Sequence, residues 1–146
     1  MNWLEVIAIL VIGFVGCAEF GSAALVHPVI RKLHPDDQLV FEKGLLKTFG
    51  RIMPIGMTAA TALAISITIA TPTGWLIAAS ASLGIALIVT ILGNVPINLR
   101  TGRISQETAP EDFIAMRRRW DVFQLIRGSL QFLGFVLATI GVIGRV

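Results

Sequence analysis

The sequence predicts an all-α fold, an integral membrane four-helix bundle. Of the 146 residues, 55% are hydrophobic and the mean hydropathy is +0.80, too apolar for a soluble domain of this size. Four segments are long and apolar enough to cross a bilayer. No segment alternates with a period of two, which argues against a β-barrel, the other fold that satisfies the backbone in lipid. We therefore expect a single domain over residues 1–146, with helices over about 3–29, 52–70, 75–94 and 113–143.

The first predicted helix contains an apolar stretch over residues 6–26 whose one charged residue is Glu19. An ionisable side chain inside the hydrocarbon core costs roughly 2.5–3.5 kcal/mol to insert. Glu19 therefore requires a buried partner, a water-filled cavity or a proton-coupled function. The stretch lacks a basic leading region and is too long for the core of a cleavable signal peptide. Cys17 is the single cysteine, so an internal disulfide and a cysteine-based metal cage are excluded.

Helix start and stop signals divide the rest of the chain. We expect the first helix to stop at His27-Pro28, the turn 71–74 to join helices two and three, and the third helix to end within 93–98. Proline and acidic residues at 35–37 and 110–112 predict amphipathic cytoplasmic helices before helices two and four, the last beginning around Phe113. In the first of these, the apolar side consists of Leu39, Val40, Phe41, Leu45, Leu46 and Phe49.

The basic residues predict the orientation. Of the 12 lysines and arginines, Arg145 alone lies outside the two long loops and the first turns of helix four. By the positive-inside rule, both long loops are cytoplasmic and both termini face out, in a multi-pass protein of the cell inner (plasma) membrane. The sequence pI of about 9.8 then reflects this topology and not nucleic-acid binding. We interpret the loop arginines as a lipid-facing basic rim.

Helix four carries the clearest polar pattern. Its members are spaced by 4, 3 and 4 residues, which places them within an arc of about 60°. They are Trp120, Gln124, Arg127 and Gln131. A polar stripe in a spanning helix is expected to face the bundle interior. It can supply interhelical hydrogen bonds alone, but a membrane arginine seldom serves packing alone, so we interpret Arg127 as a functional or counter-ion residue.

Residues from three helices are expected to converge at the cytoplasmic leaflet. Asn94 and Asn98 share a face on either side of Pro96, and an alternative role for them is a helix cap that anchors the loop. Helices one and three run inward while helix four runs outward, so both asparagines are expected near His27, Trp120 and Arg127. Glu19 lies eight residues before His27, roughly 12 Å deeper. We therefore expect Glu19 to lie apart from Arg127 as a desolvated, neutral carboxyl group, the alternative being that the two residues pair.

These residues resemble the anthrone oxygenase-like proteins, a family of small four-helix membrane proteins. The matching pieces are His27-Pro28, the block Asn94-Val95-Pro96-Ile97-Asn98, and Arg118-Arg119-Trp120 followed by Arg127. They span most of the chain, and the resemblance implies the same four-helix topology. A few members oxidise polycyclic anthrones to anthraquinones without a known cofactor, and most members have no assigned activity. The resemblance thus implies a monooxygenase that uses no cofactor.

Oxidation of an anthrone needs a base for the acidic C–H, donors for the resulting oxyanion, and an apolar slot that excludes water. Our hypothesis assigns Glu19 or His27 as the base. Arg127, Asn94 and Asn98 are the donors and Trp120 is a stacking wall, with Gln124 and Gln131 also expected at the substrate. No pair of His, Cys or carboxylate residues has metal-ligand spacing, so we expect no metal.

Two other functions stay open at this point. A small proton-coupled transporter is suggested by a membrane glutamate in the first of four helices, although the two long loops and the one-sided basic residues argue against it. A noncatalytic membrane subunit, in which Glu19 and Arg127 merely pair, is the other. The expected partners are the lipid bilayer and a lipophilic small molecule, with no nucleic acid, and a homo-oligomer remains open.

The charge pattern makes a direct prediction about topology. Reporter domains fused after Thr73 and at the C-terminus should report the outside, and fusions near Lys43 or Thr108 should report the cytoplasm. Alkaline phosphatase and fluorescent protein fusions measure this. A C-terminal fusion that reports the cytoplasm would contradict the orientation.

Overall fold

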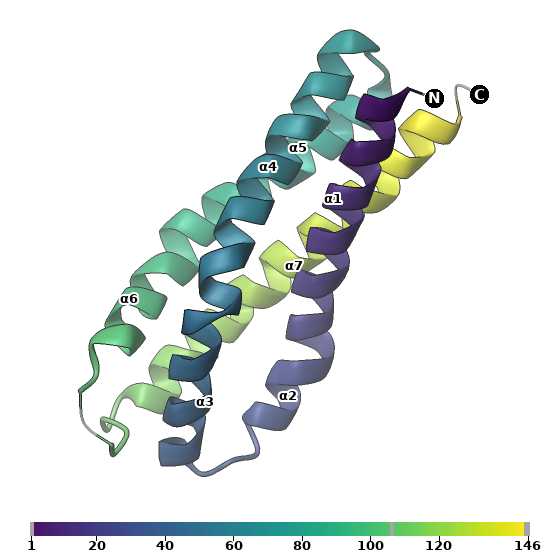
Figure 1. Cartoon of the computed structure of the whole chain (residues 1–146). Helices are drawn as coiled ribbons and strands as arrows, with labels where there is room; N and C mark the ends of the chain where they lie inside the picture. Colours follow the sequence, from purple (N-terminus) through teal and green to yellow (C-terminus); the bar gives the residue numbers. More distant parts are fainter. Residues whose placement is uncertain (1, 106, 145–146) are drawn as a thin grey trace.

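The computed structural model describes residues 2–105 and 107–144, and within these ranges the chain is folded into helices without strands (Figure 1). The elements are α1 (Trp3–Gly21), η1 (Ser22–Val26), α2 (His27–Ile30), α3 (Pro35–Lys47), α4 (Phe49–Ala70), α5 (Gly74–Val89), η2 (Thr90–Asn94), α6 (Val95–Arg103) and α7 (Phe113–Ile143). Several join end to end, which leaves four helices long and apolar enough to span a membrane. These are Trp3–Ile30, Phe49–Ala70, Gly74–Arg103 and Phe113–Ile143. The prediction of an all-α, four-helix, multi-pass membrane protein is confirmed.

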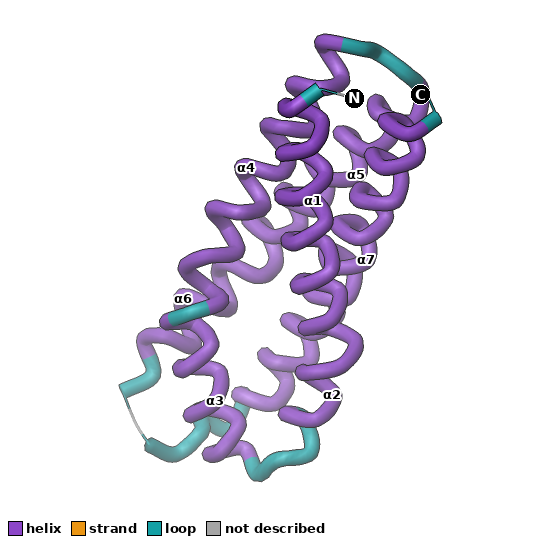
Figure 2. The backbone as a smooth tube through the Cα atoms, turned by 45° about the vertical axis from the view of Figure 1, so that its right-hand side comes forward, coloured by secondary structure: helices purple, strands orange, loops and turns teal. Residues whose placement is uncertain are grey.

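The bundle has two different ends. Both ends of the described chain and the short α4–α5 turn lie at one end, which we call the terminal end, while α3 and the two long connections lie at the other, the loop end (Figures 1 and 2). At the loop end, the backbone N–H of Ala109 donates to Asp36 Oδ1 at 2.7 Å, which ties the connection before α7 to the start of α3. Arg145, the basic residue expected at the terminal end, lies outside the described residues.

The first and third spanning helices continue through their prolines, contrary to the expected stops. His27 N–H donates to the carbonyl of Ser22, and Val95 N–H donates to that of Thr90, each five residues back. Each π turn ends immediately before an X-Pro step, so the helix shifts its hydrogen-bond register where proline has no N–H to donate. The first helix therefore reaches Ile30 and the third reaches Arg103. Asn94 and Asn98 consequently lie within a helix and do not cap its end.

Helix α3 forms where an amphipathic helix was predicted, but its inward face combines part of the predicted apolar side, namely Leu39, Leu45 and Leu46, with polar residues. The buried side chains are those of Gln38, Leu39 and Glu42, whereas Val40 and Phe41 are 65% and 55% exposed. Gln38 and Glu42 face the bundle because each accepts a hydrogen bond from Arg31, at 3.1 and 2.9 Å. Polar contacts therefore set the orientation of α3.

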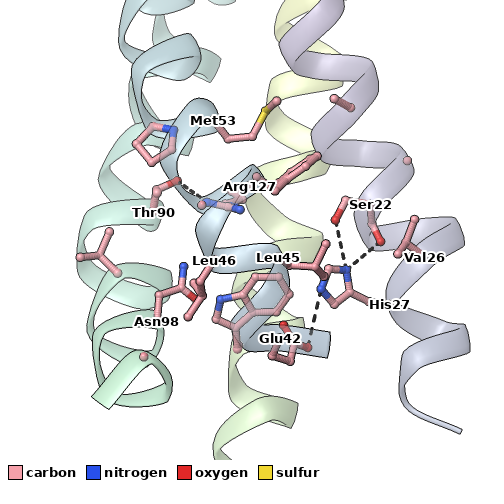
Figure 3. A pocket seen from close by; sticks show the side chains of 18 of the residues that line it. Ser22, Val26, His27, Glu42, Leu45, Leu46, Met53, Thr90, Asn98 and Arg127 are labelled. Carbon is pink, nitrogen blue, oxygen red and sulfur yellow. Dashed lines mark hydrogen bonds and ion pairs between the residues drawn. The ribbon is translucent and has the colours of Figure 1, made fainter. Parts of the chain in front are cut away.

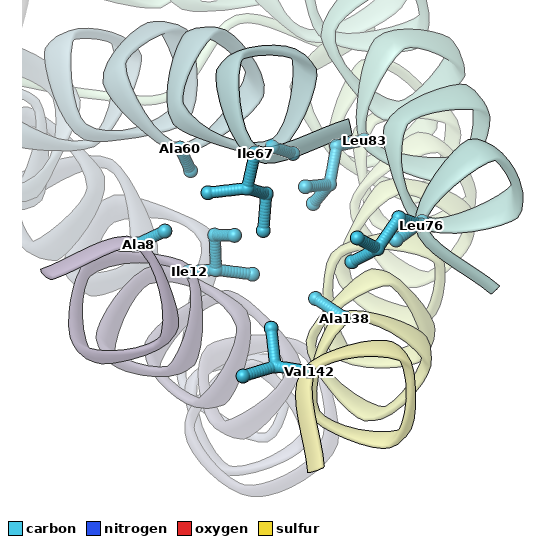
Figure 4. Packing of buried hydrophobic residues seen from close by; sticks show 10 residues of the cluster. Ala8, Ile12, Ala60, Ile67, Leu76, Leu83, Ala138 and Val142 are labelled. Atoms are coloured by element: carbon cyan, nitrogen blue, oxygen red, sulfur yellow. The ribbon is translucent and has the colours of Figure 1, made fainter. Parts of the chain in front are cut away.

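The two halves of the bundle are packed differently. The loop half contains a cavity (Figure 3), whereas the terminal half is an apolar core of small and branched residues from all four spanning helices (Figure 4). The core consists of Ala8, Ile12, Ala60, Ala64, Ile67, Leu76, Ala79, Leu83, Ala138 and Val142. Between the halves, α1 and α7 come into backbone contact at two glycines. A Cβ added at Gly16 would lie 2.9 Å from the carbonyl oxygen of Gln131, and one at Gly128 would lie 3.0 Å from that of Glu19.

Substitution of Gly16 tests this close approach. Gly16→Ala should destabilise the protein by about 1–3 kcal/mol, because its methyl group overlaps backbone that cannot move as a side chain can. The control is Gly84→Ala on α5, where an added Cβ meets nothing within 4 Å and the higher helix propensity of alanine adds at most about 1 kcal/mol. Thermal unfolding in detergent compares the two, and equal melting temperatures would contradict the contact.

Candidate functional site

A cavity of about 820 Å³ lies in the loop half of the bundle, a volume suited to a small organic ligand (Figure 3). Its walls come from the first helix, α3, α4, the third helix and α7. Most of the lining is apolar and includes Leu25, Val26, Leu45, Leu46, Phe49, Met53, Pro54 and Leu99. The polar lining residues are Ser22, His27, Glu42, Thr90, Asn98, Arg103, Trp120 and Arg127. A ligand in this cavity would thus meet apolar walls and a small set of polar groups.

The polar stripe of α7 faces the bundle interior, as its spacing predicted. Trp120, Gln124, Arg127 and Gln131 are between 0% and 5% exposed. The stripe is longer than the sequence interpretation allowed, because Arg117, three residues before Trp120, is also buried with an exposure of 1%. The two arginines of the stripe belong to two charged clusters, a deeper one at Arg127 and a shallower one at Arg117, on either side of Trp120.

The deeper cluster joins Glu19 to Arg127, which corrects the expectation that Glu19 lies apart from a basic partner. Arg127 Nη2 lies 2.9 Å from Glu19 Oε2. Gln124 bridges the two: its Nε2 donates to Glu19 Oε2 at 2.8 Å and its Oε1 accepts from Arg127 Nε at 2.7 Å. Glu19 is therefore in direct contact with a guanidinium, and the expectation that it lies apart from Arg127 is wrong.

Glu19 meets Arg127 because Arg127 lies deeper in the bundle than the sequence interpretation placed it. The rings of His27 and Trp120 lie 4.5 Å apart between centroids, so these two residues share one level. From that level Glu19 is eight residues deeper on the first helix, and Arg127 is seven residues deeper on the antiparallel α7. At 1.5 Å per residue both lie roughly 11–12 Å beyond the ring pair, and therefore meet.

The shallower cluster contains two arginines and two carboxylates, none of which the sequence interpretation placed in the site. Arg31 binds both oxygens of Asp121, with Nε donating at 2.6 Å and Nη2 at 2.8 Å, and its Nη2 also donates to Glu42 Oε1 at 2.9 Å. Arg117 Nη2 lies 2.7 Å from Glu42 Oε2. The interpretation of these arginines as a lipid-facing rim is therefore wrong for Arg31 and Arg117. The spacing signal that could have found Arg117 is its place three residues before Trp120 on the stripe.

The shallower cluster balances its own charge. Burial alone would lower the pKa of Arg31, but the hydrogen bond that Arg31 donates to Asp121 and the charge of Glu42 outweigh it, so the pKa is raised above its ordinary value. Arg31 therefore stays charged at every physiological pH. With two cations and two anions in contact, the cluster joins α2, α3 and α7 without a net buried charge.

Trp120 lies between the two clusters and forms a wall of the cavity. The Cζ atom of Arg117 lies 4.3 Å from the Trp120 ring centroid and that of Arg127 lies 5.9 Å from it, both within the range of a cation–π contact. The indole Nε1 is buried and has no hydrogen-bond partner among the described residues. Trp120 therefore offers a flat surface and one free N–H donor.

His27 has a defined tautomer. Its Nδ1 lies 2.9 Å from the carbonyl oxygen of Ser22, which can only accept, so Nδ1 carries the hydrogen. In the neutral ring Nε2 is then unprotonated, and this buried atom has no hydrogen-bond partner in the described chain. It lies 3.9 Å from Glu42 Oε1 (Figure 3). His27 thus presents a proton acceptor at the cavity, with a carboxylate near enough to stabilise the imidazolium that protonation would form.

The other expected site residues divide into those that reach the cavity and those behind it. Asn98 lines the cavity, and its Oδ1 is buried without a partner among the described residues. Asn94 lies behind the wall, where its Nδ2 donates to the carbonyl of Trp120 at 3.4 Å. Gln131 is fully buried, and neither of its amide atoms has a partner within the described ranges. His27, Asn98, Trp120 and Arg127 therefore meet at the cavity, whereas Glu19, Gln124, Asn94 and Gln131 do not line it.

Comparison with known proteins matches the chain to a protein family. The family model described as anthrone oxygenase matches residues 38–137, from within α3 to within α7. The matched range contains Asn94, Asn98, Trp120 and Arg127, and begins after Glu19 and His27. No curated protein and no solved structure matches the chain.

The Glu19–Arg127 pair generates a prediction about stability. Glu19→Gln should destabilise the protein by about 3–5 kcal/mol, because it leaves the guanidinium of Arg127 buried without its counter-ion. Adding Arg127→Met should restore part of the loss, because both charges are then removed. Thermal unfolding in detergent measures this, with the exposed loop variant Glu107→Gln as the control. An unchanged melting temperature for Glu19→Gln would show that the pair contributes nothing.

Proposed function

Because the chain belongs to the anthrone oxygenase family, we propose that it binds a flat lipophilic aromatic molecule in this cavity and oxidises it with dioxygen, as an anthrone is oxidised to an anthraquinone. The observation that carries the proposal is that two adjacent side chains of the cavity wall each carry an unpartnered buried polar atom. These are the basic Nε2 of His27 and the N–H of Trp120, whose rings are 4.5 Å apart. Two neighbouring rings at the wall of an apolar cavity of ligand size thus carry a base and a hydrogen-bond donor.

His27 is the base in this proposal. The C–H of an anthrone opposite its carbonyl is acidic, since loss of the proton gives an aromatic enolate. His27 Nε2 takes that proton and the electron pair remains on the substrate. The imidazolium that forms keeps Nδ1–H on the Ser22 carbonyl and turns Nε2–H toward Glu42. Glu19 is no longer our candidate, because its Oε2 is bound by Arg127 and Gln124 and the residue does not line the cavity.

The enolate oxygen needs a positive environment. Trp120 Nε1–H supplies a free hydrogen-bond donor, and Arg127 supplies a positive charge at the cavity wall. The guanidinium is held in place through three of its own contacts, to Glu19, Gln124 and Thr90. Such an oriented charge does not have to reorganise as the substrate becomes anionic, and this lowers the barrier to proton removal.

Dioxygen is the oxidant, and the reaction balances without a further reagent. The enolate passes one electron to dioxygen, and the two radicals combine to form a C–O bond. The resulting peroxide takes up the proton from His27. Loss of the second C–H proton from the same carbon then breaks the O–O bond, which leaves a carbonyl group and releases water. One anthrone and one dioxygen thus give one anthraquinone and one water.

The paired state of Glu19 argues against a small proton-coupled transporter. In that mechanism the membrane carboxyl group must exchange its proton at the transport site, whereas Glu19 contacts a guanidinium and is fully buried. A noncatalytic subunit would account for the ion pairs. It would not account for a cavity with a free histidine nitrogen and a free indole N–H at its wall.

The two histidines of the chain provide a matched test. His27→Gln should lower the rate of anthrone oxidation by about 10²–10⁴-fold, because glutamine retains a polar side chain but cannot take the proton. His34→Gln removes an exposed histidine at the start of α3 and should leave the rate unchanged. Oxygen uptake and anthraquinone absorbance in detergent measure the rate. Wild-type turnover in His27→Gln would exclude His27 as the base.

A further inference from the structure

The cavity is open on the side between the first helix and α4. Nearer the terminal end these helices touch, since a Cβ added at Gly56 would lie 2.9 Å from Val15 Cγ2. Toward the loop end they diverge in both views of the backbone (Figures 1 and 2). The facing edges there are Cys17, Ala18, Gly21 and Leu25 on the first helix, and Phe49, Gly50 and Pro54 on α4, all of which line the cavity. A Cβ added at Gly21 meets nothing within 4 Å, so open space begins directly at its backbone.

This opening lies at the depth of the hydrocarbon core. The first spanning helix is Trp3–Ile30, and Cys17 stands at its middle, roughly 20 Å from either end at 1.5 Å per residue. Leu25 lies eight residues further toward the loop end, roughly 12 Å from the middle. Both positions fall within the ~15 Å half-thickness of a hydrocarbon core. The edge formed by Cys17, Gly21 and Leu25 therefore faces lipid chains.

The polarity of the cavity changes from this edge to the far wall. Leu25 is 73% exposed at the edge, and its neighbours there are small or apolar. Three unpartnered polar atoms of the lining, His27 Nε2, Trp120 Nε1 and Asn98 Oδ1, are buried, and the first two belong to side chains that are each 5% exposed. An apolar molecule from the bilayer would thus cross a mostly apolar edge first and meet the unpartnered polar atoms deeper in the cavity.

We propose that the opening between residues 17–25 and residues 49–54 is a lateral portal, through which a flat lipophilic molecule passes from the bilayer directly into the cavity. The identity of the molecule rests on the proposed function, whereas the opening itself does not. The portal restricts ligands to those that partition into membranes, and Gly21 controls its width because it leaves the passage without a side chain.

Cys17 reports on the portal because it is the single cysteine of the chain and is exposed at the edge. In lipid nanodiscs, N-(1-pyrenyl)maleimide, a flat polycyclic thiol reagent, should modify Cys17, and a sulfonated water-soluble maleimide should react far more slowly. Gly21→Phe, one turn away on the same helix face, should slow the pyrenyl reaction about tenfold by narrowing the passage. Intact-protein mass spectrometry measures the rates.

Gly84→Phe is the matched control, because Gly84 also faces open space but lies on α5, away from the cavity. It should not change the rate. Leu25→Trp, a second substitution at the edge, should slow the reaction as Gly21→Phe does. If both edge variants react as fast as wild type, or if the sulfonated reagent matches the pyrenyl one, the lateral portal is wrong.

An assay of anthrone oxidation tests the lateral portal and the proposed function separately. With anthrone dissolved in the nanodisc lipid, Gly21→Phe should also slow turnover, while Gly84→Phe should not. Absence of turnover in the wild-type protein would reject the proposed function, and the labelling rates would still decide the portal. Equal turnover in wild type and Gly21→Phe would reject the portal and leave the proposed function standing.

Discussion

The ion pair between Glu19 and Arg127 is the interaction on which the rest of the bundle depends. Each charge lies inside a membrane-spanning helix, and either one alone would cost about 3–5 kcal/mol. The first helix and α7 must therefore keep one relative register. Gly16 and Gly128 make this possible, because their missing side chains let the two backbones approach closely beside the pair. Gln124 then fixes the geometry of both charged groups.

At the loop end, ion pairs of the shallower cluster likewise hold helices together. Glu42 forms ion pairs with both Arg31 and Arg117, and these pairs hold α3 against the bundle. The same helix also buries the apolar side chain of Leu39. Trp120 lies between the two clusters and within cation–π range of a guanidinium from each. The loop half is thus held together by polar contacts that surround a cavity, while the terminal half is held by a packed apolar core.

Both π turns lie beside this cavity, which matches the frequent occurrence of such turns at functional sites. In η1 the carbonyl of Ser22 receives the backbone N–H and the side-chain Nδ1 of His27. That double contact sets the histidine tautomer and leaves Nε2 toward the cavity. In η2 the altered register precedes Pro96 and keeps Asn98 in a continuing helix, where it lines the cavity. A proline in a spanning segment can therefore mark a π turn beside a binding cavity and not the end of the helix.

Local patterns in the sequence were sufficient for the four spanning helices and for the inward face of α7. Lipid forces each segment to satisfy its own backbone, and a helical period of 3.6 residues determines which side chains share a face. The same patterns identified His27, Asn98, Trp120 and Arg127, all of which line the cavity. They also suggested that Glu19 needed compensation, although they did not identify its partner.

Only the tertiary structure decided which charges meet. Glu19 pairs with Arg127 and Glu42 with Arg117 across helices that are distant in the chain, and Glu42 also pairs with Arg31. Such pairs depend on the relative depth of two helices, and one helical turn of about 5.4 Å is enough to exchange one partner for another. The inward position of Gln38 and Glu42 on α3 was likewise decided by their contacts with Arg31, which leave Val40 and Phe41 exposed. The sequence by itself determined the helices and their faces, because these depend on local periodicity; the tertiary structure decided the ion pairs and the cavity, because these depend on how the helices are placed against one another.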